Sequence, residues 1–162
     1  MTWQLAAFNV AKIRQPLDHP DMAGFVDNLD PVNRLGDESP GFVWRHQTDD
    51  GDSTAERIFD DHDILLNYTV WESVEALQAF TYKSAHTDFL RQRRQWFVPL
   101  DDWPVLVLWW IRAGERPSLE EAKARLHRLR DQGPSPEAFT FRHPFDPPAD
   151  DGIEPDRSES IR

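Results

Sequence analysis

Residues 64–110, ILLNYTVWESVEALQAFTYKSAHTDFLRQRRQWFVPLDDWPVLVLWW, decide the fold because they contain the two most apolar strand-like runs and the helical segment between them. Residues 65–71 are a short, largely apolar run that ends in an aromatic side chain, which predicts a strand buried on both faces. Residues 105–111, VLVLWWI, have the same character. A strand, helix, strand unit of this length predicts half of a small α+β domain.

The segment between the two runs has helical spacing. Ser73 is suited to cap a helix, and apolar side chains follow it at Val74, Leu77 and Phe80. Counting on from Tyr82, further positions of a single helical face are occupied by His86, Phe89, Leu90, Arg93 and Phe97. We expect this face to point inward, with the helix ending at Pro99.

The N-terminal part of the chain predicts the matching half of the domain. Residues 3–13 suit a central strand that is covered on two sides. A helix is expected from about Pro20, with Met22, Phe25, Val26 and Leu29 as its buried stripe, and Pro31 should interrupt it. Residues 42–47 alternate like a strand with one drier face, and a hairpin with a polar loop should follow.

The C-terminal part predicts an appended helix. Ser118 and Glu121 form a capping box, and Gly133 followed by Pro134 should end the helix. Its apolar stripe consists of Leu119, Ala122, Leu126 and Leu129. Residues 138–141, AFTF, predict a short strand or a strap that packs on the body. We therefore divide the chain into residues 1–112, a helix and strap at 113–145, and a disordered acidic tail at 146–162.

The composition excludes several classes of function. The chain has 162 residues, which is enough for one domain with its own core. It contains no Cys, so disulfides, thiolate nucleophiles and Cys-based metal sites are absent. A net charge of -11 argues against nucleic acid as a partner. Neither a membrane span nor a secretory signal is recognisable, so we expect no membrane association and a cytoplasmic location.

The one conceivable metal cluster is at residues 60–63, where Asp60, Asp61 and Asp63 surround His62. Carboxylates are ligands for hard cations, but the spacing lacks the alternating ligands and the glycine of an EF-hand. We interpret this run as a solvated edge and expect no metal site.

The order strand, helix, strand, strand, helix, strand predicts the ferredoxin-like βαββαβ sheet. Two helices can cover one face of such a sheet, yet the strands are apolar on both faces. Pairing the second faces of two chains would bury them. We therefore expect a homodimer.

Several motifs resemble those of a known family. These are SPGFVWR, NYTVWESVEAL, RRQWF, VLWW followed by AG, PSLEEAKARL, and GP before AFTF. Together they resemble the bacterial family of unknown function numbered 3291, over nearly the whole chain to about Phe145. The VWES junction and the following His86 also resemble the dimeric α/β-barrel superfamily, which includes antibiotic-biosynthesis and haem-degrading monooxygenases. The resemblance departs at Glu115, where the family commonly has a His.

The superfamily resemblance implies a cavity between the sheet and its helices. It implies catalytic roles for His86 and Asn9, and a substrate-binding role for Asn67, Tyr68, Trp71 and Arg93. A His near neutral pH can take a substrate proton, and an amide or indole N–H can stabilise the oxyanion that develops. The same side chains also have a simpler structural interpretation, with Asn9 bonded to a neighbouring loop, His86 as a core histidine and the tryptophans as core and dimer-interface aromatics.

Three hypotheses follow from the resemblance. The first is a small-molecule-binding protein that resembles cofactor-independent monooxygenases and oxidises an aromatic or apolar substrate. The second is a protein that binds or degrades haem, with His86 as the ligand. The third is a binding or interaction protein without catalysis.

Overall fold

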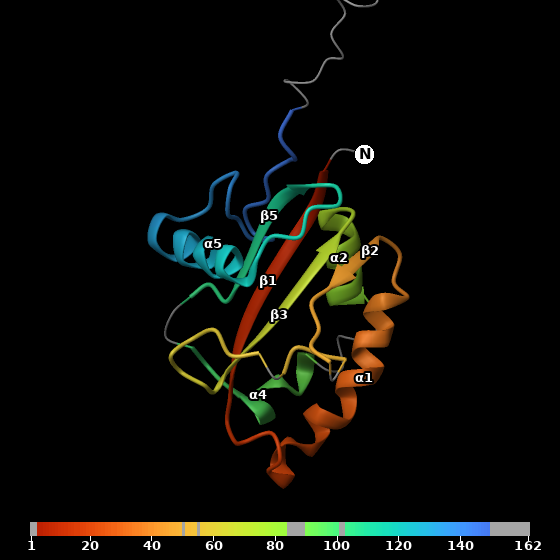
Figure 1. The fold of residues 1–162 in the computed structure, drawn as a ribbon, viewed down its shortest axis with the longest axis vertical. Coiled ribbons are helices and arrows are strands. Elements are labelled where there is room, and N and C mark those ends of the chain that lie inside the picture. The colour runs from red at the N-terminus through yellow and green to blue at the C-terminus, as the bar shows by residue number, and fades with distance from the viewer. Residues whose placement is uncertain (1–2, 50, 55, 84–89, 101–102, 150–162) are drawn as a thin grey trace, which may run out of the picture.

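The computed structural model describes residues 3–49, 51–54, 56–83, 90–100 and 103–149. Its elements are β1 (Trp3–Ile13), η1 (Pro20–Met22), α1 (Ala23–Asp37), β2 (Phe42–Arg45), β3 (Ile64–Trp71), α2 (Val74–Lys83), α4 (Arg93–Trp96), β4 (Phe97–Val98), β5 (Leu106–Arg112) and α5 (Leu119–Gln132) (Figure 1). The predicted order of elements is confirmed, and so is the helix after the last main strand.

β1 is the central strand of an antiparallel sheet. It pairs with β3 along one edge and with β5 along the other, and β2 pairs with the far edge of β3. The resulting order, β5-β1-β3-β2, is that of the ferredoxin-like fold. β4 adds a short pairing at the end of β1, where Ile13 lies opposite Phe97. The predicted α+β fold class is confirmed.

The two faces of the sheet have different covers. In Figure 1, β1 runs between α5 on one side and α1 and α2 on the other. Phe8 and Trp109 point toward α5 and join a cluster with Ala122, Leu126 and Leu129. We call this side the α5 face. On the opposite side, the α1–α2 face, one apolar cluster packs against α2 and another against α1 and α4.

The packing on the α5 face contradicts one premise of the sequence analysis. Phe8, Val107 and Trp109 are 0% exposed within the single chain. Their cover comes from α5 and from Ile58 and Phe59 of the β2–β3 connection. The premise that one chain cannot cover both faces is therefore wrong. The homodimer itself stays a prediction, because this structure contains one chain.

Helix α1 also differs from the prediction, because it continues through Pro31. A proline removes one backbone hydrogen bond from a helix, to the carbonyl four residues earlier. Both Pro31 and Asp27 are exposed, so water can satisfy that carbonyl. The predicted buried stripe is confirmed at Met22 and Phe25, whereas Val26 is 38% exposed.

The predicted long helix before Pro99 ends earlier than expected. Its last described turn, α4, stops at Trp96, and Phe97 adopts an extended conformation and begins β4. Phe97 pairs with Ile13 on β1 and packs edge-on against Phe25, with ring centroids 5.1 Å apart. Strand pairing and aromatic packing therefore replace the last helical turn.

One glycine allows β2 and α2 to meet. Gly41 has φ 84, and a Cβ at this position would lie 2.5 Å from the Cβ of Ala76 on α2. The Gly41 carbonyl accepts a hydrogen bond from the N–H of Glu72 at 2.7 Å. A side chain at position 41 would therefore separate the β2 start from α2.

The C-terminal elements follow the prediction closely. Ser118 accepts a hydrogen bond from the N–H of Glu121, and Gly133, with φ 77, ends α5. Phe139 exchanges two backbone hydrogen bonds of 2.8 Å with Leu108, so the strap extends the sheet beside β5. The division at residues 112 and 145 stays a prediction. Of the predicted tail, residues 150–162 lie outside the described part of the chain.

A buried tyrosine joins β3 to the start of α5. Tyr68 is 1% exposed, and its hydroxyl donates to the Pro117 carbonyl at 2.9 Å. Burial and the carboxylate of Glu121 raise the pKa of Tyr68 well above its ordinary value, with Arg116 opposing them. The fold therefore accepts the neutral phenol and resists its ionised form.

The first prediction concerns the cover of the α5 face. Leu126 is 0% exposed, so Leu126→Ala should lower the free energy of unfolding by about 2–5 kcal/mol through lost burial and the cavity left behind. Urea unfolding measures this value. Ala124→Ser, at an exposed position of the same helix, should change it by less than about 0.5 kcal/mol. Equal effects would contradict the packing of α5 on the sheet.

The second prediction concerns pH. The stability that Tyr68 contributes is fully present below the ordinary tyrosine pKa of about 10 and is lost as the pH rises above it. In Tyr82→Phe, Tyr68 is the single remaining tyrosine. Tyrosinate absorbance should then rise together with the loss of far-ultraviolet circular dichroism. A rise near pH ~10 in a folded protein would contradict this environment.

Candidate functional site

Two asparagines face each other across the centre of the sheet. Asn9 on β1 lies directly opposite Asn67 on β3 in the antiparallel register. The Nδ2 atom of Asn67 donates a hydrogen bond to the Oδ1 atom of Asn9 at 3.3 Å. Side chains alternate along a strand, so both amides project from the α1–α2 face. The structure thus brings together two of the residues expected in the cavity.

The amide of Asn67 is open to solvent although it lies in the middle of a strand. Asn67 is exposed and Asn9 is half-buried, while Leu66 and Tyr68, the neighbours of Asn67, are 5% and 1% exposed. The helices that cover the rest of the α1–α2 face therefore leave this position accessible.

The amide pair lies between two apolar clusters on the same face. One cluster, against α2, contains Leu5, Ala7, Trp71, Val74, Leu77, Leu108 and Phe139. The other, against α1 and α4, contains Ile13, Met22, Phe25, Leu65 and Trp96. Next to the pair, the register places Ala7 opposite Thr69 and Ala11 opposite Leu65. We call Asn9, Asn67, Thr69, Ala7 and Ala11 the amide site.

Trp71 lies beside the amide site and contacts it through Thr69. It is 1% exposed, and its indole N–H donates to the Thr69 hydroxyl oxygen at 2.9 Å. Its ring packs against Phe42 and Phe80, with centroids 5.4 and 5.2 Å away. Because Thr69 accepts from Trp71, its own hydroxyl hydrogen is left able to donate. Sequence reasoning missed Thr69, although its position two residues from Asn67 places it on the same face.

Two other expected lining residues lie elsewhere. Tyr68 projects from the α5 face, since it is adjacent to Asn67 in the strand, and its ring packs on Trp44 and Trp109. Arg93 is exposed rather than inward. Its predicted orientation assumed one continuous helix, whereas the chain turns at Gln92 and α4 begins anew. Neither residue joins the amide site.

His86, the expected catalytic or haem-binding residue, lies outside the described residues. Its role remains an expectation from the sequence. The same holds for Phe89 on the predicted helical face.

The acidic run at residues 60–63 forms a solvated edge. Asp61 accepts a hydrogen bond from the N–H of Asp63 and pairs with the Nζ atom of Lys12 at 2.7 Å. The hydrogen bond from Lys12, followed by that from Asp63, lowers the pKa of the Asp61 carboxyl. Within the described ranges, no three His, Asp or Glu side chains come together in a group that could hold a metal ion.

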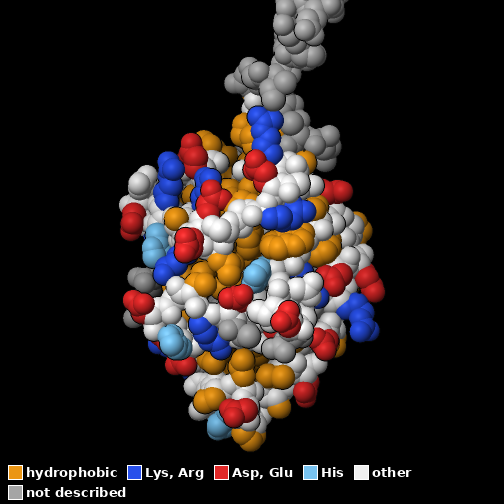
Figure 2. Space-filling view, in the orientation of Figure 1, with side chains coloured by type: hydrophobic (Ala, Val, Ile, Leu, Met, Phe, Trp, Pro, Cys, Tyr) orange, Lys and Arg blue, Asp and Glu red, His pale blue; other side chains and the backbone are white. Residues whose placement is uncertain are grey.

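The visible surface is mixed in charge. In Figure 2, Lys and Arg side chains are interspersed with acidic and apolar ones and form no continuous basic area on this face. None of the described helices is both long and apolar enough to cross a bilayer.

Known structures with a similar chain path share little sequence with this protein. SnoaB from Streptomyces nogalater, a cofactor-independent oxygenase, is 14% identical, with a TM-score of 0.44 over 72% of this chain and 96% of that chain. A protein of unknown function from Nitrosomonas europaea is 12% identical, with a TM-score of 0.46 over 72% and 97%. A protein from Pseudomonas aeruginosa is 12% identical, with a TM-score of 0.45 over 71% and 97%.

The sequence itself gives a clear family assignment. No curated protein matches this chain. Residues 4–154 match one family along nearly the entire described sheet, α5 and the strap. The motifs quoted above all fall within these residues. The chain belongs to the family described as Domain of unknown function (DUF3291).

Proposed function

We propose that this protein binds a small aromatic or otherwise apolar molecule at the amide site and hydrogen-bonds an oxygen atom of that molecule. One observation carries the proposal. The hydrogen-bonded pair of Asn9 and Asn67 is accessible at mid-strand, between two apolar clusters of one sheet face. Ligand sites typically combine apolar walls with a few polar groups that fix orientation.

The donors of the amide site suit an oxygen that carries negative charge. Asn67 uses one amide hydrogen on Asn9, which leaves its second hydrogen and the Nδ2 group of Asn9 able to donate. The Thr69 hydroxyl can donate from the adjacent position. Three neutral donors directed at one oxygen would stabilise a phenolate or enolate relative to the neutral molecule. Ala7 and Ala11, on either side of Asn9, have small side chains that would not obstruct a ring placed beside these donors.

This chemistry supports a monooxygenase-like reaction without a cofactor as the finer proposal. A phenolic substrate with a CH2 group between two aromatic rings can lose a proton to form an electron-rich anion that reacts with O2. One oxygen atom becomes the ketone oxygen, and the other leaves as water with the two hydrogens of the CH2 group. In this proposal Asn9, Asn67 and Thr69 hold the anion, and His86 takes the proton near neutral pH.

The third prediction tests the amide site by binding. Asn67→Leu keeps the branched shape of the side chain but removes its donors. The affinity for 2-naphthol should fall about fivefold, because one hydrogen bond contributes about 1 kcal/mol, while the affinity for naphthalene should not fall. Isothermal titration calorimetry measures both. The matched control is Asn28→Leu on the exposed side of α1, where the side chain bonds to the Gly24 carbonyl.

Equal weakening of both probes by Asn67→Leu would contradict the hydrogen-bonding role, and so would an equal effect of the control. Oxygen-electrode measurements with a phenolic anthrone then separate an oxygenase from a protein that only binds. A saturable Soret change with haemin that disappears in His86→Ala would instead favour the haem alternative.

We also propose a homodimer in the bacterial cytoplasm, as the superfamily resemblance suggests. Because α5 covers the α5 face, the two chains would have to meet through another surface. The fourth prediction is that sedimentation at micromolar concentration gives twice the chain mass of 18.9 kDa. Sedimentation at the mass of one chain would overturn the dimer and leave the amide site unaffected.

A further inference from the structure

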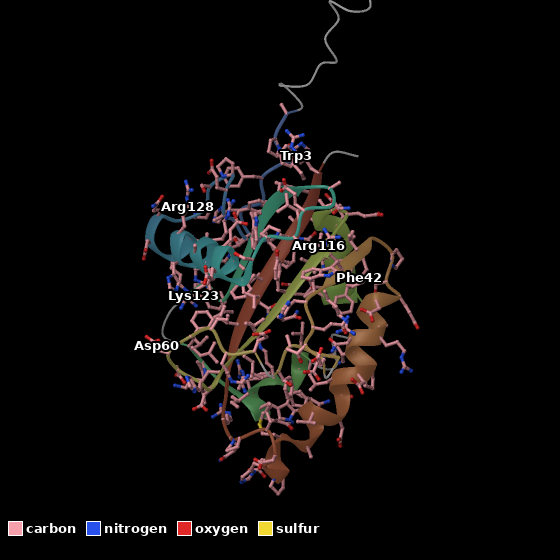
Figure 3. The ribbon with its side chains drawn as sticks, in the orientation of Figure 1. Trp3, Phe42, Asp60, Arg116, Lys123 and Arg128 are labelled. Carbon is pink, nitrogen blue, oxygen red and sulfur yellow. The ribbon has the colours of Figure 1, made fainter. Side chains whose placement is uncertain are left out.

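A groove of about 590 Å³ lies at the end of the sheet where α2 begins, away from the amide site. In Figure 3, Trp3 lies at this end of β1, beside the C-terminal segment, by which we mean the described residues 144–149. The groove shares no residue with the amide site. Its lining comes from the start of β1, the first turns of α2 with Glu72 before it, Trp110 of β5 and residues 144–147 of the C-terminal segment.

The aromatic wall of the groove is held by defined contacts. The indole N–H of Trp110 donates to the Phe145 carbonyl at 2.8 Å. Phe145 packs on Phe139, with ring centroids 5.8 Å apart, and Phe139 exchanges backbone hydrogen bonds with Leu108 of β5. The C-terminal segment is thus fixed on the sheet where it forms the wall.

The charge of the groove is negative. Three carboxylates line it, those of Glu72, Glu75 and Asp146, and the lining includes no Lys, Arg or His. None of the three forms an ion pair with another described residue. The N-terminus of α2 favours acidic residues at Glu72 and Glu75. It does not account for Asp146, which the C-terminal segment brings from a distant part of the chain.

The groove also contains aromatic rings, and the negative potential on the face of such a ring attracts cations. The guanidinium of Arg112 lies 4.5 Å from the centroid of the Trp3 ring, so this ring already holds one cation beside the groove, and a ligand cation would add to it on the side of the carboxylates. Aromatic faces next to unpaired carboxylates form the chemical complement of an organic ammonium group.

We propose that this groove binds an organic cation, namely an amine that carries an aromatic or aliphatic group. The ammonium lies among the carboxylates of Glu72, Glu75 and Asp146. The apolar part packs against Trp110 and Phe145. This site is separate from the amide site and does not depend on the function proposed for it.

The fifth prediction uses three probes of similar shape and different charge on the full chain. Phenethylammonium should bind more tightly than 2-phenylethanol, on the order of tenfold, and phenylacetate should bind least. Added salt should weaken phenethylammonium selectively, because the carboxylates are accessible to solvent. Two-dimensional NMR of the tryptophan indole N–H groups measures affinity and reports whether Trp3 and Trp110 respond.

Two variants test whether the preference for the cation arises in the groove. The double variant Glu75→Gln with Asp146→Asn should abolish most of the preference for the cation and leave 2-phenylethanol binding unchanged. Glu120→Gln, at an exposed position of α5, is the matched control and should retain the preference. Thermal unfolding confirms that each variant is folded.

Equal binding of the three probes would overturn the proposal, and so would a preference that survives the double variant or absence of binding to about 10 mM. A chain that ends at Ala149 tests a competing occupant. Unchanged affinity supports the proposal. Binding that is seen only after this truncation would assign the groove to the chain's own C-terminal residues and overturn it.

Discussion

The structure depends on the pairing of β1 along both of its edges. A strand in the middle of a sheet has no edge open to solvent, so its stability rests on what covers its two faces. Leu5, Ala6, Ala7 and Phe8 are successive residues, and each is at most 3% exposed. Two different covers are therefore required, and α5 provides one while α1 and α2 provide the other. Both candidate sites lie on the second side, where the cover is incomplete.

The sequence predicted the elements well but not where each one packs. The bounds of β1 and the caps of α5 at Ser118 and Gly133 were predictable, since they depend on local spacing and turn chemistry. The stripe of Leu126 and Leu129 indicates that a helix docks, but it does not indicate on which surface. For this reason the α5 face was assigned to a second chain. Long-range packing, such as the Tyr68 hydroxyl on Pro117, has no signature in local sequence.

The candidate site was predictable to the extent that strand alternation determines it. Asn9 and Asn67 were both expected in the cavity, and the antiparallel register places them opposite each other on one face of the sheet. The same alternation should have excluded Tyr68, which is adjacent to Asn67. The inward position of Arg93 was wrong because helical counting fails at Gln92, where the chain turns. The bond from Trp71 to Thr69 decides which donors face a ligand, and sequence spacing does not determine such a contact.

The net charge of the protein affects ligand binding at the two proposed sites in opposite ways. With a net charge of -11, the overall field repels an anion and attracts a cation. A site for a phenolate must therefore act at short range, and the amides of Asn9 and Asn67 can do so because they are neutral donors that would contact the oxygen directly. A site for an ammonium gains from this field as well as from direct contacts, which suits the open groove near Glu75. The apolar cluster around Trp71 and Leu77 lies between the two regions. A phenolate thus requires neutral donors beside apolar surface, as at the amide site. An ammonium requires carboxylates that are open to solvent, as in the groove.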